Sequence, residues 1–452
     1  MESASVSTRP RRGDELELRV ESLAFGGAGV ARLDGYVLFV AGAVPGDRVR
    51  AVVTKSKRAY AEGRAVELLE PAPDRVAPRA DHPGVPWQVL PYERQLEVKA
   101  NQVADALARI GRLEAHELGP MVPAREQWRY RNKLEYSFGT GPDHRLVCGF
   151  HEPGRWDRIV AVEDCLLASE RGNAARRQVL DWCRAEGLDA YDRRTGTGLL
   201  RNLVVREGRR TGQIQVRLVT STGSLRAEAL AGAVDCEGLL WTRTSDRGET
   251  TAGGETRLLA GAEKLEEELG GLRFAISSEA FFQTNTEMAE VLYELAGEAA
   301  GLAGWERVFD LYGGIGTLGL TLAPRAGELW GVEVVEAAVA DAIDNARANE
   351  IDNAHFFAGD VRLAMRELVE RAGRPDVCVI DPPRAGLSRK VVRRLIEAAP
   401  ARIVYVSCNP TTLAPNAAQL VEAGYALRRV TPVDMFPQTP HIECVAMLER
   451  SA

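Results

Sequence analysis

The sequence predicts an α/β protein whose C-terminal part is a doubly wound parallel sheet, preceded by a small β-barrel and a mixed α+β region. Residues 271–452 alternate apolar strand-like runs with helical patterns, which is typical of a parallel sheet covered by helices. Residues 10–70 contain short alternating runs separated by glycine and proline turns, as in a compact β module. A length of 452 residues, with 45% hydrophobic and 27% charged residues, suits about three globular domains.

Composition and charge restrict the compartment and the partner. No uncharged apolar stretch of about 18 residues occurs, which excludes a transmembrane helix. The polar N-terminal segment lacks the apolar core of a signal peptide. The seven scattered cysteines contain no CxxC pair and fit reduced thiols, so we expect a cytoplasmic protein. Because the net charge is −7, a nucleic-acid partner must be argued from local clusters of cations.

Residues 10–70 predict a barrel of about five short strands with a basic edge. Between Arg48 and Arg64, six cations stand against one acid, Glu62, and Tyr60 lies among them. Such an edge can follow phosphates and stack on a base. Charge alone fits a solvated edge strand equally well.

Residues 73–270 follow a proline-rich linker and predict a second domain of α+β type. A helix is expected over residues 92–110, where Leu96, Val103 and Leu107 recur at helical spacing. Strand-like pieces such as YRNKLEYSFG and GQIQVRLVT follow this helix.

A second basic cluster lies within this domain. Seven arginines fall between Arg193 and Arg217, against the single acid Glu207 within that part of the chain. Two such clusters in an acidic protein favour contact with nucleic acid.

The first chemical motif lies where the first strand of the C-terminal domain ends. Gly314, Gly316 and Gly319 follow an apolar run in GxGxxG spacing and open a helix. Glycine permits the tight turn and the close approach of backbone to a ligand. Nicotinamide-binding and flavin-binding folds share this spacing, so the motif alone leaves the ligand open.

Two acids end the next two predicted strands. Glu333, in LWGVEVV, is placed to accept hydrogen bonds from both ribose hydroxyls of a nucleoside. Asp360, in FFAGD, would end the third strand beside an adenine. The alternative for Glu333 is a surface acid that starts a helix.

Asp381 ends the fourth strand in the turn DPPR. Two prolines would hold its carboxylate at the reaction centre. Adenine and cytosine amino methyltransferases use a similar turn followed by an aromatic residue, whereas Arg384 stands here. The missing aromatic plane favours methylation of carbon over methylation of an amine.

Cys408 ends the fifth strand in SCNP and is the candidate nucleophile. A thiol just before a helix can have its pKa lowered by nearby amides and the helix dipole. Such a thiolate could add to carbon 6 of a pyrimidine and turn carbon 5 into a nucleophile. A lone cysteine on a strand is more often inert core. The coincidence of three motifs at strand ends reverses that preference.

A base must remove the proton from carbon 5 so that the cysteine can leave. The segment Pro440-His441-Ile442-Glu443 offers two candidates, and we prefer Glu443 to His441.

Together these motifs resemble the RNA uracil-5 methyltransferases, the S-adenosylmethionine-dependent 5-methyluridine family. The resemblance covers nearly the whole chain and includes YRNKLEYSFG, SSEAFFQTNTEMAEVLY, DLYGGIGTLGL, DPPRAGL, VYVSCNPTTLAPN and PHIECVAML. It implies a TRAM barrel over residues 10–70 that binds RNA, a central RNA-recognition domain over residues 73–270 and a Rossmann-like class I methyltransferase domain over residues 271–452.

The resemblance also implies a role for each site residue. Cys408 would be the nucleophile and Glu443 the proton acceptor, with Asp381 in the same catalytic group. The methyl donor, S-adenosyl-L-methionine, and the uracil would be bound by a second set, of which Thr317 and Asp360 match more variable positions. That set is Gln283, Tyr312, Gly314, Gly316, Thr317, Glu333, Asp360 and Asp381. Phe281 and Phe282, beside Gln283, are interpreted as core residues.

The chain departs from the family pattern at two places. Many TRAM-bearing members carry four cysteines for an iron–sulfur cluster, but Ala80 stands where the first would be and only Cys165 remains. Because a single thiolate cannot hold such a cluster, we expect neither a cluster nor another metal. Pro415 and Asn416 replace the usual Ala-Arg-Asp continuation of the helix after Cys408.

The expected function is methylation of carbon 5 of a uridine in RNA, with rRNA favoured over tRNA and the base flipped out of its loop. The expected protein is a monomer with RNA as its partner and no contact with a membrane. The alternative is a catalytically inactive RNA-binding or RNA-folding protein that keeps the fold. A nicotinamide oxidoreductase is disfavoured because it explains neither DPPR nor SCNP.

Overall fold

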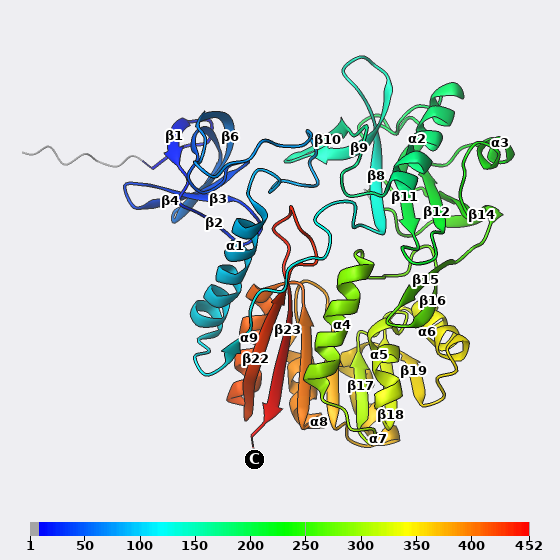
Figure 1. Ribbon diagram of the computed structural model, residues 1–452. Coiled ribbons are helices and arrows are strands. Elements are labelled where there is room, and N and C mark those ends of the chain that lie inside the picture. Colours follow the sequence, from blue (N-terminus) through cyan, green and yellow to red (C-terminus); the bar gives the residue numbers. More distant parts are fainter. Residues whose placement is uncertain (1–8, 249, 452) are drawn as a thin grey trace, which may run out of the picture.

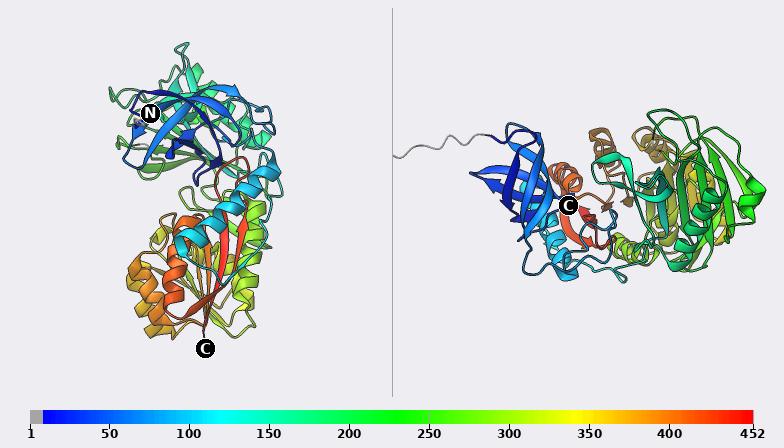
Figure 2. Two further views of the ribbon diagram at one scale, coloured as in Figure 1. Left: turned by 90° about the vertical axis from the view of Figure 1, so that its left-hand side faces the viewer. Right: turned by 90° about the horizontal axis from the view of Figure 1, so that it is seen from above.

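The computed structural model describes residues 9–248 and 250–451. A small β module and a larger sheet domain lie side by side above a C-terminal α/β domain (Figure 1). Figure 2 shows the C-terminus at the end of the α/β domain that faces away from both accessory units. Among the described residues, no helix is long and apolar enough to cross a bilayer.

The N-terminal module is a six-stranded sheet. Its strands are β1 (Glu15–Arg19), β2 (Ser22–Leu23), β3 (Gly29–Leu33), β4 (Tyr36–Ala41), β5 (Arg48–Ser56) and β6 (Tyr60–Glu70). Their order is β1-β5-β6-β4-β3-β2, and β4 pairs parallel to β6. Alternate side chains such as Leu18, Val40 and Val53 form its apolar core.

The basic edge predicted between Arg48 and Arg64 is largely neutralised by acids on neighbouring strands. Because β5 lies between β1 and β6, Arg48 pairs with Glu17 on one side and with Glu70 on the other, at 2.7 Å each. The predicted excess of positive charge on this edge is therefore much reduced. The further pairs are Arg50 with Glu67 and Lys55 with Glu62, and the cations without an ion pair to a described residue are Lys57, Arg58 and Arg64.

The helix predicted after the linker is present, but its buried face is partly polar. It consists of α1 (Tyr92–Asp105) and a π-helical continuation, η1 (Ala106–Gly111). Leu96 is only partly buried, whereas Gln95 and Lys99 are fully buried. The two polar residues face inward because both bond to residues 434–438 of the C-terminal domain.

The central domain is a seven-stranded sheet with helices. Its elements are β8 (Lys133–Thr140), β9 (Leu146–Glu152), β10 (Arg155–Ala161), α2 (Glu170–Ala185), β11 (Leu200–Glu207), β12 (Ile214–Thr220), α3 (Ala227–Ala231), β13 (Gly238–Arg243) and β14 (Glu255–Gly261). The strand order is β10-β9-β8-β11-β12-β13-β14, and α2 packs on β9, β11 and β12. A hairpin of β15 (Leu265–Leu269) and β16 (Leu272–Ile276) leads into the C-terminal domain.

The arginines between Arg193 and Arg217 do not form one basic face, contrary to the prediction. They separate into three groups because β11 and β12 lie inside the sheet, where side chains on both faces are covered. Arg201, Arg206 and Arg217 are buried, Arg209 and Arg210 pair with acids at the junction with the C-terminal domain, and Arg193 and Arg194 line a hollow at the opposite end of the sheet.

The C-terminal domain is the predicted doubly wound sheet. Its strands are β17 (Arg307–Leu311), β18 (Glu328–Glu333), β19 (Ala354–Ala358), β20 (Val377–Ile380), β21 (Arg402–Ser407), β22 (Tyr425–Val433) and β23 (Glu443–Arg450), with β7 (Glu117–Leu118) at one edge. Its helices are α4 (Thr286–Ala300), α5 (Thr317–Leu322), η2 (Ala323–Arg325), α6 (Glu336–Ala348), α7 (Val361–Ala372), α8 (Arg389–Ala398) and α9 (Pro410–Glu422).

The strand order of this sheet is β19-β18-β17-β20-β21-β23-β22-β7. The five strands from β19 to β21 are parallel, and β23 is inserted antiparallel between β21 and β22. The carboxyl ends of the parallel strands therefore face the two accessory units, at the upper edge of the sheet in Figure 1. Ligands of such sheets bind at this edge.

Candidate active site

The glycine-rich loop between β17 and α5 turns sharply back over the sheet. Tyr312, Gly314 and Gly316 all have positive φ, at 67°, 56° and 84°. The amides of Tyr312 and Gly313 both donate to the carbonyl of Val332, which holds the loop against β18. A Cβ at Gly314 would meet no atom within 4 Å, so this glycine faces open space.

Asp310, at the end of β17, lies beneath this loop and was assigned no role from the sequence. A Cβ at Gly313 or Gly319 would lie 2.9 or 2.5 Å from its Oδ2, so these glycines make room for the carboxyl group. Burial, together with Asp381, raises the pKa of Asp310 to about 7. The apolar pattern of β17 predicts that position 310 is buried. An acid at a buried position was the one feature of the sequence that could have indicated a functional role for Asp310.

Glu333 and Asp360 lie at neighbouring strand ends, as predicted from their positions in the sequence. Glu333 accepts hydrogen bonds from the amides of Gly314 (3.2 Å) and Val335 (2.9 Å). Asp360 caps α7 and pairs with Arg362, which lowers the pKa of the Asp360 carboxyl. The two acids thus border the glycine-rich loop on one side.

Asp381 follows β20 and meets Gln283 from the segment before α4. The Gln283 amide donates to Asp381 Oδ2 at 3.3 Å. Asn132, just before β8, donates to the backbone carbonyl of Gln283 at 2.8 Å, which ties the Gln283 backbone to the central domain. Burial raises the pKa of Asp381 to about 7, while the Gln283 bond lowers it in part.

Cys408 and Glu443 are brought together by the register of β21 and β23. Ser407 pairs with Cys444 at the end of this antiparallel ladder, and Cys408 and Glu443 are the next residue along on each side. Glu443 is among the groups that raise the pKa of Cys408, so the thiol and the carboxyl group lie near each other at the sheet edge. Asp381 is close enough to influence the pKa values of both.

The pKa of Cys408 is raised to about 11, not lowered as we expected from its place before a helix. Burial is the largest cause, and Glu443 and Asp381 add to it, while Arg384 lowers the pKa in part. The pKa of Glu443 is raised well above its ordinary value by burial and by Asp381. The expectation was wrong because burial and two acids outweigh one guanidinium and the local amides.

The predictions for His441, Phe281 and Phe282 are only partly matched by the burial of these residues. His441 is partly buried, and burial with nearby cations lowers its pKa to about 4. Phe282 is core, as interpreted, but Phe281 is 65% exposed, so that interpretation was wrong for Phe281. Side chains on adjacent positions of this extended segment point to opposite sides.

The TRAM-like module reaches this site through the turn between β2 and β3, which was not anticipated. A Cβ at Gly27 would lie 3.0 Å from Pro440 Cγ, next to His441. The Phe25 ring lies 6.0 Å from the guanidinium carbon of Arg384. The N-terminal module therefore borders the segment that leads to Glu443.

The two departures from the family pattern have structural counterparts. His82 Nε2 lies 3.2 Å from Cys165 Sγ, and both side chains are buried. Across residues 9–248 and 250–451, no three His, Cys, Asp or Glu side chains are arranged to hold a metal ion. Pro415 lies inside α9 without interrupting it, and the Asn416 side chain both accepts from and donates to the backbone of Leu387.

The sheet order and the glycine-rich loop define the class I methyltransferase fold, with the Rossmann-like domain and N-terminal module that we predicted. The model of the tRNA (Uracil-5-)-methyltransferase family matches residues 262–451, and the model of the TRAM domain matches residues 9–66.

Known relatives match over almost the whole chain. An uncharacterized RNA methyltransferase of Halalkalibacterium halodurans is 39% identical over 97% of each chain, and one of Porphyromonas gingivalis is 38% identical over 96% of this chain and all of its own. A solved tRNA uracil-54 methyltransferase of Pyrococcus abyssi, in complex with S-adenosyl-L-homocysteine, is 29% identical with a TM-score of 0.78. It covers 96% of this chain and all of its own. The chain belongs to the S-adenosylmethionine-dependent RNA uracil-5 methyltransferase family, as its motifs predicted.

Proposed function

We propose that the protein methylates carbon 5 of a uridine in RNA, with Cys408 as nucleophile and Glu443 as proton acceptor. The observation that carries this proposal is that Cys408 and Glu443 directly follow the last pair of the β21–β23 ladder, so that the thiol lies near a buried carboxyl group. The Asp381–Gln283 pair lies at the neighbouring strand end. This arrangement fits a reaction that needs a nucleophile and a base on one flat ring.

The residues of the donor site fit S-adenosyl-L-methionine. Gly314 and Gly316 leave the loop open, Glu333 borders the loop, and Tyr312, Thr317 and Asp360 lie along the same edge. Bound there, the donor would supply the methyl group and bring a positive sulfonium charge near Glu443 and Asp381, the two acids that act on Cys408. That charge favours ionisation of the Cys408 thiol, whose pKa burial and acids otherwise raise to about 11.

The proposed reaction proceeds in two steps. The Cys408 thiolate forms a bond to carbon 6, and the electron pair released to carbon 5 takes the methyl group. Glu443 then accepts the proton from carbon 5, and the bond between carbon 6 and sulfur breaks to return the thiolate. The raised pKa of Glu443 suits an acceptor of a weakly acidic carbon-bound proton. Asp381 and Gln283 would hold the polar edge of the uracil.

The target base must leave its stack to reach a thiol at the sheet edge. The TRAM module and the central domain flank that edge, and we propose that both contact the RNA. Of the two RNA classes, rRNA is the expected substrate and tRNA is the class methylated by the Pyrococcus abyssi neighbour. The seven cysteines are all free, which suits a reducing cytoplasm.

The activity is tested by incubating the protein with labelled donor and with rRNA and tRNA fragments, then mapping 5-methyluridine by mass spectrometry. We expect the modification at a single uridine. No 5-methyluridine in any RNA, together with measurable RNA binding, would favour the inactive RNA-binding alternative.

The roles of Cys408 and Glu443 are separated by trapping. RNA containing 5-fluorouridine has no proton on carbon 5 to remove, so the wild type should form a stable covalent adduct. Cys408→Ala should form none, whereas Cys236→Ala, at another incompletely buried thiol, should react normally. Glu443→Gln should accumulate the adduct with ordinary uridine RNA, because only release is blocked. An adduct on Cys408→Ala would reassign the nucleophile.

A further inference from the structure

A hollow of about 240 Å³ lies at the end of the central sheet, away from the active site. It is bordered by the ends of β8 and β11 and by residues 190–194. Strand β8 rises from the C-terminal domain toward this end of the sheet (Figure 1). From Asn132, which bonds to Gln283, to Gly139 at the hollow, seven residues of strand span about 23 Å.

Two aromatic rings line the hollow, each with an arginine over its face. Trp156 on β10 is 55% exposed, and the guanidinium carbon of Arg194 lies 5.4 Å from its ring centroid. Arg201 lies 4.9 Å from the ring centroid of Tyr191. Such pairs of a ring and a guanidinium plane present flat surfaces on which another ring can stack.

The charge at the rim of the hollow is positive. Arg193, Arg194 and Arg201 line it together with only two acids, Asp157 and Asp192. Both acids are engaged, because Asp157 pairs with Arg194 at 2.5 Å and also with Arg155, and Asp192 accepts from the amide of Arg194 at 2.7 Å. The arginines therefore outnumber the acids in a chain whose net charge is −7.

We propose that this hollow binds one unpaired nucleotide of the substrate RNA, with its base stacked on Trp156 and its phosphate held by Arg193 and Arg194. The proposal rests on the proposed function, since it names a second contact of the same RNA. The volume admits a single planar ring, and the exposed tryptophan would otherwise be an unfavourable surface group. Its distance from Gln283 lets the RNA strand that enters the active site reach it.

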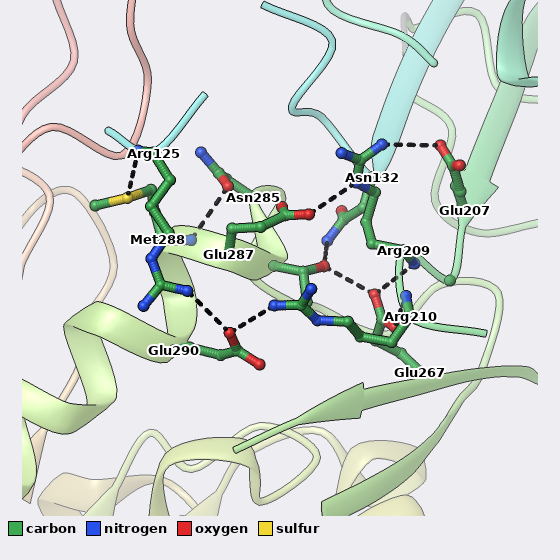
Figure 3. A network of polar contacts seen from close by, with 12 residues as sticks. Arg125, Asn132, Glu207, Arg209, Arg210, Glu267, Asn285, Glu287, Met288 and Glu290 are labelled. Carbon is green, nitrogen blue, oxygen red and sulfur yellow. Dashed lines mark hydrogen bonds and ion pairs between the residues drawn. The ribbon is translucent and has the colours of Figure 1, made fainter. Parts of the chain in front are cut away.

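A second arginine-rich hollow shows why this one is different. It contains Trp128 together with Arg125, Arg129, Arg209 and Arg210. These arginines are paired with acids of the same region, as Figure 3 shows for Arg125, Arg209 and Arg210. A phosphate would have to displace an ion pair at either hollow, because Arg194 is also paired, with Asp157. The hollows differ in their aromatic rings, since Trp156 is exposed, whereas Trp128 is partly covered and lies under Arg79.

The test measures RNA binding by fluorescence anisotropy in the Cys408→Ala background, which cannot turn over. We expect Trp156→Ala to weaken binding of the substrate RNA about tenfold and Trp156→Phe to restore most of the affinity. The matched control is Trp305→Ala, at a tryptophan that is 70% exposed. Trp305 lies just before β17, at the amino ends of the parallel strands and therefore opposite the active-site edge. This variant should leave the affinity for RNA unchanged.

Replacing Arg193 and Arg194 with alanine should reduce the slope of log affinity against log salt by about one to two. Unchanged affinity and salt slope in these variants, with an active wild type, would overturn the hollow as a nucleotide site while leaving the methyltransferase proposal intact. Weakened binding by Trp156→Ala alongside an inactive wild type would instead support the hollow and reject the activity.

Discussion

The two accessory units are attached to the C-terminal domain by different chemistry. The central domain meets it through partly exposed ion pairs around the buried Glu267 (Figure 3) and through the buried Asn132. The N-terminal side, with its linker and α1, meets it through fully buried polar groups and close backbone packing. The difference bears on function, because the N-terminal attachment holds the chain segment that ends at Glu443.

At the central junction, arginines of the β11–β12 turn reach acids on α4. Arg209 pairs with Glu287 at 3.3 Å, and Arg210 pairs with Glu290 at 2.7 Å. Glu267 is the buried centre of this network, where it accepts from the amides of both arginines and from the Thr286 hydroxyl. The outer pairs are reachable by water and the inner acid is not.

At the N-terminal attachment, α1 holds the loop between β22 and β23. Lys99 Nζ donates to Asp434 Oδ1 at 2.7 Å, and both side chains are fully buried. Gln95 and Gln438 exchange two hydrogen bonds, at 2.8 and 2.9 Å. This loop continues through His441 to Glu443, so the position of the proposed base depends on buried polar contacts. We infer that this attachment tolerates fewer changes than the central junction does.

The largest effect is expected at Lys99. Lys99→Ala leaves the Asp434 carboxylate buried without its partner, which costs about 3–5 kcal/mol of folding free energy. The control is Lys390→Ala, on the exposed side of α8, which should change stability little. Urea unfolding followed by circular dichroism measures both. Equal stability of the two variants would contradict the ranking of the attachments.

Glu267 should give the next largest effect. Glu267→Ala removes the acceptor of two amides and one hydroxyl, which leaves buried donors unpaired and costs about 2–3 kcal/mol. Glu267→Gln keeps one acceptor oxygen in place and should lose clearly less stability. The same unfolding assay distinguishes them, and an equal loss would show that charge matters here more than hydrogen bonding.

Gly27 and Gly26 test whether the TRAM turn influences the active site. Both have positive φ, at 94° and 91°, so alanine at either position should cost about 1 kcal/mol from backbone strain. Only Gly27→Ala also meets Pro440, since a Cβ at Gly26 meets nothing within 4 Å. We expect a severalfold slower adduct with 5-fluorouridine RNA for Gly27→Ala alone. Equal rates would show that the contact is passive.

Arg210 should give a small effect. Its ion pair with Glu290 is partly exposed, so Arg210→Ala should cost about 0.5 kcal/mol. A double-mutant cycle with Glu290→Ala isolates the pairwise energy, which we expect to stay below about 1 kcal/mol. A larger coupling would mean that the network in Figure 3 acts as a unit.

Folding stability should also depend on pH, through two partly or fully buried histidines, His441 and His82. Burial lowers the pKa of His441 and of His82 to about 4, below the ordinary value near 6.5. Because the unfolded chain binds these protons more tightly, stability should be lost as pH falls from about 6.5 to about 4. His441→Gln should flatten this loss, whereas His144→Gln, at an exposed loop position, should not. Unfolding midpoints at pH 7 and pH 5 measure the effect.

Local patterns were sufficient for the C-terminal fold. Alternation of strand and helix placed Glu333, Asp360, Asp381 and Cys408 at the ends of successive parallel strands, and such ends meet at one edge. The same reasoning failed for Leu96, because helical periodicity does not show that Gln95 and Lys99 have buried partners more than 330 residues away. It also failed for the pKa of Cys408, because nearby acids in space are not neighbours in sequence.

The sequence by itself determined the class of fold, the family and the order in which the acids and the thiol reach the sheet edge, since these depend on local periodicity and short motifs. Tertiary structure alone decided which arginines form ion pairs, which aromatic rings stay exposed and which turn of the TRAM module borders Pro440. Charge and exposure are properties of pairs and surfaces, and chain order does not specify which distant residues become neighbours.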